Sequence, residues 1–174
     1  MGLDWIPTNK PRQGHEREFW ALWEELVNDE CADLESAHQR YEELSIQPIE
    51  TLQAHSCGPA CDGTPRYSNS PTGAVGPDSF RAECLVLSCE EIIGPELLDA
   101  AFEYMRPAEL AEYGNLLRES ALDYAKAHNV DVDNLEPAAV DDIESLEARV
   151  DMVLAASRWC LFWASNGHAL EPSF

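Results

Sequence analysis

The chain carries little positive charge for its size. Its 174 residues include 33 aspartates and glutamates but only 11 lysines and arginines, so the formal net charge is −22. Lys10 and Lys126 are the only two lysines. Binding to DNA, RNA or anionic lipid depends on lysine and arginine side chains that neutralise phosphates, so the composition disfavours these partners. It favours a basic partner protein or a cationic ligand instead.

Long apolar runs are also absent. No segment approaches the roughly 18 consecutive apolar residues that a membrane span needs. The start of the chain, MGLDWIPTNK, lacks the basic and apolar regions of a secretory signal. We therefore expect a cytoplasmic protein that does not enter membranes. In a reducing compartment its six cysteines are thiols or metal ligands more often than disulfides.

Several catalytic signatures are missing as well. The sequence has no G-x-x-x-x-G-K-[ST] phosphate loop, no G-x-G-x-x-G, no G-x-S-x-G and no H-E-x-x-H. Glu35 and His38 form one Glu-x-x-His unit, but a di-iron carboxylate bundle needs two such units and two further glutamates. These absences lead us to expect a binding or interaction module without catalytic machinery of its own.

What the sequence does contain is a globular composition with helical periodicity. Its length and its 45% hydrophobic residues predict a single domain, residues 1–174, with a sizeable core. The acidic residues are spread along the chain and not gathered in one tail. This spacing is typical of the solvated faces of folded helices.

The first half of the chain predicts one extended segment and one long helix. Residues 1–14 contain two prolines and predict an extended lead-in, from which Trp5 and Ile6 dock on the core. From His15 to Leu44, apolar residues recur at intervals of three and four. We therefore expect one amphipathic helix over this range, bent near Asn28.

The second half predicts further helices. The apolar run at 82–93 fits a helix or a buried strand, and we favour a helix because no second strand is evident to pair with it. We expect a break at Gly94-Pro95, a helix that starts there and carries Leu97 to Met105, and then a helix that begins at Pro107 and is capped by Asn129. The last helix, over 138–166, carries a second apolar stripe, so it should be buried on two sides and leaves room for a dimer.

Together these elements predict an all-α fold: an antiparallel bundle of about five helices, closed by its first and last helices, with a long central loop. Trp20 and Trp23 lie on the first helix, and Trp159 and Trp163 lie on the last. We expect the two pairs to be neighbours in the core. If they instead formed an aromatic cage, the ligand would be a cation.

The central loop, residues 55–80, is rich in glycine, proline and cysteine, and we expect it to be structured. His55, Cys57 and Cys61 form an H-x-C-x3-C pattern, which offers zinc two or three close-spaced ligands. The pattern matches no standard zinc signature. The alternatives are packed or idle thiols, a disulfide or redox pair, or a Cys–His nucleophile pair. A fourth zinc ligand would come from Cys84, Cys89, His128 or His168.

The same loop offers candidates for a ligand site. Asp62, Arg66, Tyr67 and Arg81 lie in or beside it, and Arg106 follows on a helical flank. Arginine binds carboxylates and other anions through two parallel hydrogen bonds, so an anionic ligand is one interpretation. The alternative is that each arginine pairs with a nearby aspartate or glutamate of this acidic chain.

Three functional hypotheses follow from these patterns. The leading one is an acidic binding module. The second is a zinc-dependent hydrolase that uses His55, Cys57 and Cys61 as metal ligands and Asp62 as acid or base. The third is an acidic inhibitor or mimic that neutralises a basic protein.

Overall fold

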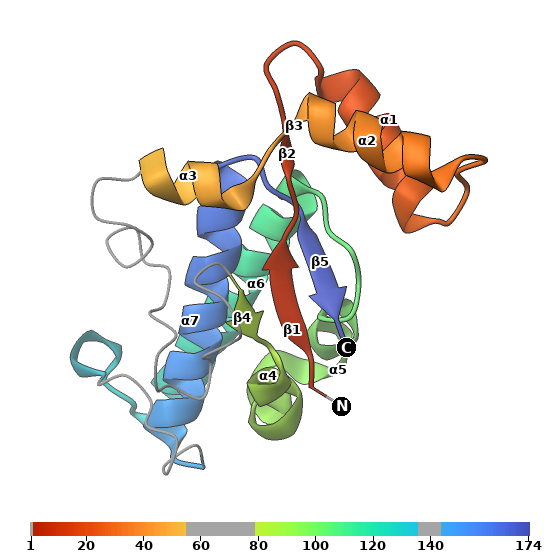
Figure 1. The fold of residues 1–174 in the computed structure, drawn as a ribbon. Helices are drawn as coiled ribbons and strands as arrows, with labels where there is room; N and C mark the ends of the chain where they lie inside the picture. Colours follow the sequence, from red (N-terminus) through yellow and green to blue (C-terminus); the bar gives the residue numbers. More distant parts are fainter. Residues whose placement is uncertain (1, 55–78, 136–143) are drawn as a thin grey trace.

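The computed structural model describes residues 2–54, 79–135 and 144–174. Over these ranges the chain is mainly helical, with seven α-helices and five short strands (Figure 1). The helices are α1 (Glu16–Val27), α2 (Leu34–Leu44), α3 (Pro48–Ala54), α4 (Glu83–Ser88), α5 (Glu90–Ala100), α6 (Pro107–His128) and α7 (Leu146–Ser165). The strands are β1 (Asp4–Pro7), β2 (Lys10–Pro11), β3 (Ser45–Ile46), β4 (Phe80–Arg81) and β5 (Leu170–Ser173).

The strands correct the all-α prediction. They form two small antiparallel sheets, one in the order β4-β1-β5 and one that pairs β2 with β3. The first and last elements of the chain do meet, but as strands: β1 and β5 lie side by side in Figure 1, and Asp4 is paired with Ser173. A bundle of about five helices is therefore not confirmed by the described residues.

The predicted lead-in, residues 1–14, is also more ordered than expected, because it contains β1 and β2. The predicted docking is wrong for Ile6, whose side chain is exposed, and is confirmed for Trp5. Its side chain is fully buried, stacks on Phe80 with ring centroids 5.3 Å apart, and donates a hydrogen bond from Nε1 to the carbonyl of Ala101 (2.9 Å). Trp5 therefore ties the small sheet to the helical core.

The core of the helical part is the pair α6 and α7, against which α4 and α5 pack. The two helices approach each other closely at Gly114, whose carbonyl accepts a hydrogen bond from Ser157 Oγ (2.7 Å). Trp159 and Trp163 on α7 are fully buried. The prediction that the last helix is buried on two sides is thus confirmed, and its apolar excess is covered within the chain.

Several helix boundaries agree with the sequence. α6 begins at Pro107, and Asn129 ends it in the left-handed conformation (φ 58°). Within the run 82–93, residues 83–88 and 90–93 are helical, as favoured, with an interruption at Cys89. The chain kinks at Gly94 (φ 72°), immediately before Pro95, and α5 ends at Ala100, before the predicted Met105. α7 begins at Leu146, where Ser145 caps it by accepting a hydrogen bond from the Ala148 amide (3.1 Å), so this helix starts later than the predicted 138; residues 136–143 lie outside the described ranges.

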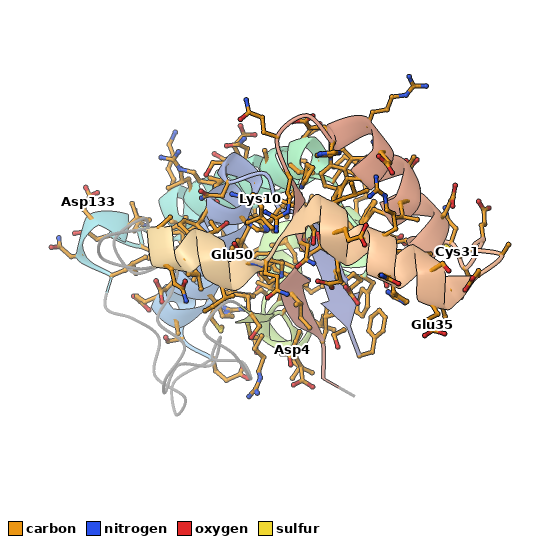
Figure 2. The ribbon with its side chains drawn as sticks, turned by 45° about the horizontal axis from the view of Figure 1, so that its top comes forward. Asp4, Lys10, Cys31, Glu35, Glu50 and Asp133 are labelled. Carbon is orange, nitrogen blue, oxygen red and sulfur yellow. The ribbon has the colours of Figure 1, made fainter. Side chains whose placement is uncertain are left out.

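The single long helix predicted for the first half is wrong. The chain turns back after Asn28: Asp29 adopts a left-handed conformation (φ 56°), and Asp33 caps a second helix by accepting a hydrogen bond from the Ser36 amide (3.2 Å). α1 and α2 form an antiparallel hairpin that stands apart from α6 and α7 at the top of Figure 1. Figure 2 shows Cys31 and Glu35 at the outer end of this hairpin.

The hairpin joins the rest of the protein through the two-residue ribbon of β2 and β3. Beside this ribbon, Lys10 and Glu50 lie close together (Figure 2), and the carboxylate of Glu50 offsets part of the fall in the pKa of Lys10 that burial causes. Next to them His168 is fully buried, hydrogen-bonded to the carbonyl of Thr8 and to the hydroxyl of Thr51. These contacts fasten α3 and the start of the ribbon to the core.

Candidate functional site

Most of the predicted site residues fall outside the described ranges. Two of the predicted ligand residues are described: Arg106, at the start of α6, and Arg81. Arg81 lies on β4 directly opposite Asp4 of β1, and its Nε is 3.8 Å from the Asp4 carboxylate. Arg81 thus fits the alternative in which an arginine pairs with a local acid. The residues outside the described ranges are His55, Cys57, Cys61, Asp62, Arg66 and Tyr67, so the zinc and ligand hypotheses built on them stay predictions.

The cysteines offered as further zinc ligands are buried. Burial raises the pKa of the Cys89 thiol to about 12, and it also raises the pKa of Cys84 and of Cys160. Cys84 Sγ donates a hydrogen bond to the carbonyl of Arg81 (3.0 Å). Metal ligation and nucleophilic attack need thiolate, so these groups are held in the unreactive form. In the part of the chain that the structure describes, no three histidine, cysteine, aspartate or glutamate side chains gather as a metal site would require.

We expect Cys84, Cys89 and Cys160 to resist a thiol reagent such as Ellman's reagent in the native protein at pH 8. The half-exposed Cys31 should react, because it lies in the open turn between α1 and α2. Denaturation in guanidinium chloride should make all six cysteines of the sequence titrate. Fast native-state labelling of Cys84 or Cys89, located by peptide mass spectrometry, would contradict the buried, protonated state.

The described residues form an open pocket of about 520 Å³ between the end of α1 and the segment that joins α5 to α6. One wall comes from the hairpin and the other from the helical core, so residues far apart in sequence face one another. The lining residues are Trp23, Glu24, Val27, Asn28, Glu103, Tyr104, Arg106 and Glu109.

Local structure explains how these side chains reach the pocket. α1 is amphipathic, and its inner face carries the buried residues Phe19 and Trp23. On the other wall, Met105 pairs with Leu170 beside β5, which holds the segment before α6 in place. Arg106 then caps α6, and its backbone amide donates to Glu109 Oε2 (2.9 Å), as in a capping box.

Aromatic rings form one side of the pocket. Trp20 and Trp23 meet edge to face with centroids 5.5 Å apart, and Tyr104 meets Trp23 edge to face at 6.1 Å. Burial raises the pKa of Tyr104, and the carboxylates of Glu171 and Asp29 raise it further, so its phenol stays protonated at neutral pH. Ring faces carry partial negative charge, which suits them to contact with cations.

The guanidinium of Arg106 already uses this surface. Its central carbon lies 5.4 Å from the ring centroid of Trp20 and 6.0 Å from that of Trp23. Its Nη2 pairs with Glu24 Oε1 (2.5 Å) and donates to the carbonyl of Trp20 (3.5 Å). A cation at a helix N-terminus is disfavoured by the helix dipole. The rings and the Glu24 carboxylate therefore provide the attraction that offsets this cost.

The charges around the pocket favour a cation. Its lining holds three glutamates, Glu24, Glu103 and Glu109, against the single Arg106. The lining includes no cysteine, histidine or serine. What this arrangement offers chemically is therefore recognition of a positive group by ring faces and carboxylates.

The prediction that the two tryptophan pairs are neighbours is wrong. Trp159 and Trp163 belong to the buried cluster around Trp5, whereas Trp20 and Trp23 pack with each other and with Phe19 and Tyr104. Of the two pairs, Trp20 and Trp23 have a cation beside their rings, which is the guanidinium of Arg106. The sequence did not predict the rest of the pocket. Its second wall consists of residues between 103 and 109, and no periodicity in the sequence shows that this segment packs beside α1.

Comparison with known proteins finds no matching family model, no matching curated protein and no matching solved structure. Among the described helices, none combines the length and the apolar character that crossing a bilayer requires. Function is therefore argued from the geometry of the pocket and from the charge of the chain.

Proposed function

We propose that this protein is a binding module for a basic partner, and that the pocket between α1 and the start of α6 accepts a cationic side chain of that partner. The observation that carries the proposal is the placement of Arg106. At the pocket wall the guanidinium of Arg106 lies 5.4 Å from the ring centroid of Trp20 and 6.0 Å from that of Trp23, and it pairs with the Glu24 carboxylate. The remaining open volume is lined by groups of the same kind, namely Tyr104, Glu103 and Glu109.

The charge of the whole chain supports the same partner. A net charge of −22 attracts basic molecules over long range and raises the rate of encounter with them. Such attraction is steeply dependent on salt and supplies little specificity by itself. A pocket with aromatic walls supplies the short-range discrimination that a diffuse acidic surface lacks.

The test is binding of a fluorescent oligo-arginine peptide, measured by anisotropy at low and high salt. Two double variants of equal charge separate the pocket from the acidic surface. Glu103→Gln with Glu109→Gln neutralises the pocket, while the control, Glu112→Gln with Glu119→Gln, neutralises two exposed positions on α6 outside the pocket lining. Glutamine at 109 keeps an oxygen that can accept the Arg106 amide.

We expect the pocket variant to weaken peptide binding by about tenfold, and the control to weaken it by about threefold or less. The pocket charges contact the bound cation at short range, whereas the control charges act through solvent. If both variants lost the same amount of peptide affinity, the pocket would not be the binding site, and the hypothesis of an acidic inhibitor or mimic would be favoured. An absence of peptide binding even at low salt would overturn the binding-module proposal.

A further inference from the structure

The contacts of Arg106 indicate which cation the pocket suits. A guanidinium is planar and weakly hydrated, so it stacks on indole rings and still directs its edge N–H groups to a carboxylate. The central carbon of Arg106 lies 5.4 Å and 6.0 Å from the ring centroids of Trp20 and Trp23, and its Nη2 pairs with Glu24. An ammonium is compact and more strongly hydrated, so it loses more on leaving water for such a site.

The Arg106 contacts are exposed enough to be exchanged. The side chain of Arg106 is 37% exposed and that of Glu24 is 56% exposed. Exposed ion pairs contribute little to stability, and an incoming guanidinium would replace the same contacts with equivalent ones. Exchange would therefore cost little, and the released Arg106 can turn to solvent.

The contacts of Arg106 also connect the α1–α2 hairpin to α6, so displacing Arg106 would break that connection. α1 and α2 join the rest of the chain through the short ribbon of β2 and β3, and the Arg106 contacts link α1 to the start of α6. A cation at a helix N-terminus contributes nothing favourable to that helix. The role of Arg106 that fits all these contacts is to fill a guanidinium site from within the chain.

We infer that Trp20, Trp23 and Glu24 form a guanidinium site, here called the arginine clamp, which Arg106 occupies and from which an arginine of the partner displaces it. The inference rests on the proposed function for the identity of the partner, and it narrows the cationic side chain to arginine. The clamp itself is a property of this chain, so it can be tested without any partner.

The first test is chemical rescue. Arg106→Ala empties the clamp, and propylguanidinium at millimolar concentration should refill it. We expect the variant to melt about 2 °C below the wild type, as the loss of one exposed ion pair and its ring contacts implies, and propylguanidinium to restore at least half of that loss. Propylammonium and the neutral N-propylurea should restore none of it. Arg118→Ala on α6 is the matched control, because Arg118 is exposed and lies outside the pocket lining; propylguanidinium should leave its melting temperature unchanged.

The second test uses the wild-type protein and needs no variant to fold. Oligo-arginine should bind at least about tenfold more tightly than oligo-lysine of equal length and charge. If Arg106→Ala folds, it should bind oligo-arginine more tightly than the wild type, because the internal competitor is gone. Acrylamide quenching of tryptophan fluorescence reports occupancy of the clamp through Trp20, since Trp5, Trp159 and Trp163 are fully buried and Trp23 is only 7% exposed.

The outcomes separate the two proposals. Rescue by propylguanidinium without peptide binding would support the clamp and overturn the binding-module function. Equal binding of arginine and lysine peptides, with no rescue, would overturn the clamp and leave the binding module standing. Rescue by propylammonium as strong as that by propylguanidinium would also overturn the clamp, because the site would then recognise any positive charge and not the guanidinium group.

Discussion

Replacing Gly114 with alanine should lower the free energy of unfolding by about 2 kcal/mol. Glycine in a helix interior normally costs about 1 kcal/mol relative to alanine, so the exchange would stabilise an isolated helix. Here a Cβ at position 114 would lie 2.9 Å from Cys160 Cβ and 3.1 Å from Leu161 Cγ. Cys160 Cβ is fixed to the backbone of α7, so relief requires α6 and α7 to move apart. That movement also strains the hydrogen bond from Ser157 Oγ to the Gly114 carbonyl.

Urea unfolding followed by circular dichroism measures this loss. The neighbouring Asn115→Ala is the matched control: it alters an exposed side chain on the same helix, whose one hydrogen bond goes to the Ala111 carbonyl, and should change stability by about 0.5 kcal/mol or less. Adding Cys160→Gly to Gly114→Ala removes the closest clash, so the two effects should couple and not add. A Gly114→Ala protein as stable as the wild type would mean that α6 and α7 do not approach this closely.

The helices of the second half could be predicted because their ends carry local chemistry. Pro107 fixes the first turn of α6, and Asn129 tolerates the left-handed conformation that ends it. The break between α1 and α2 had a local signal too, since Asp33 followed by Ser36 is a capping pattern. The apolar stripe runs past that break, and its periodicity concealed the turn.

The strands carry no comparable signal. β1 and β5 have four residues each, and both contain proline, which lacks a strand hydrogen-bond donor and usually argues against a strand. They are stable because Trp5 fills the core beneath them and because the two ends of the chain meet. Both causes are tertiary, so no window of sequence contains them.

The candidate site was missed for a related reason. The interpretation of Arg106 as an anion-binding residue came from its nearness in sequence to the central loop. In the structure its guanidinium contacts Trp20, 86 positions away in the chain, and pairs with the acid Glu24. A cation preference was predicted for the tryptophans and an anion preference for the arginine. In the structure the predicted cation-binding tryptophans, Trp20 and Trp23, contact the predicted anion-binding arginine, Arg106.

His168 should give the protein an acid-sensitive component of stability. Its ring is fully buried, and Nδ1 lies 2.7 Å from the Thr8 carbonyl, which can only accept, so Nδ1 carries the proton. Nε2 then accepts from the Thr51 hydroxyl (2.7 Å). Burial lowers the pKa of His168 from 6.5 to about 4; the hydrogen bond to Thr8 works against this shift, and the nearby Lys10 charge adds to it. The native protein thus holds the neutral ring in a pH range where the unfolded chain protonates it.

The sign of this pH dependence follows from which state, native or unfolded, binds more protons at His168. Above pH 6.5 the ring is neutral in both states, so it adds no pH dependence. Between pH 6.5 and about 4 the unfolded state binds more protons, so the free energy of unfolding falls as the pH falls. The shift corresponds to about 3 kcal/mol, all of it lost by the time the native ring also titrates.

The many carboxylates of this chain titrate over part of the same range, so the measurement compares variants. His168→Asn can keep a donor for the Thr8 carbonyl but cannot titrate, and His38→Asn alters an exposed histidine on α2. Between pH 7 and pH 4, the stability advantage of the wild type over His168→Asn in urea unfolding should shrink by about 3 kcal/mol. The curve of His38→Asn should run parallel to that of the wild type. Parallel curves for wild type and His168→Asn would mean that the ring titrates alike in both states, and that it is not the buried, neutral link between α3 and the core.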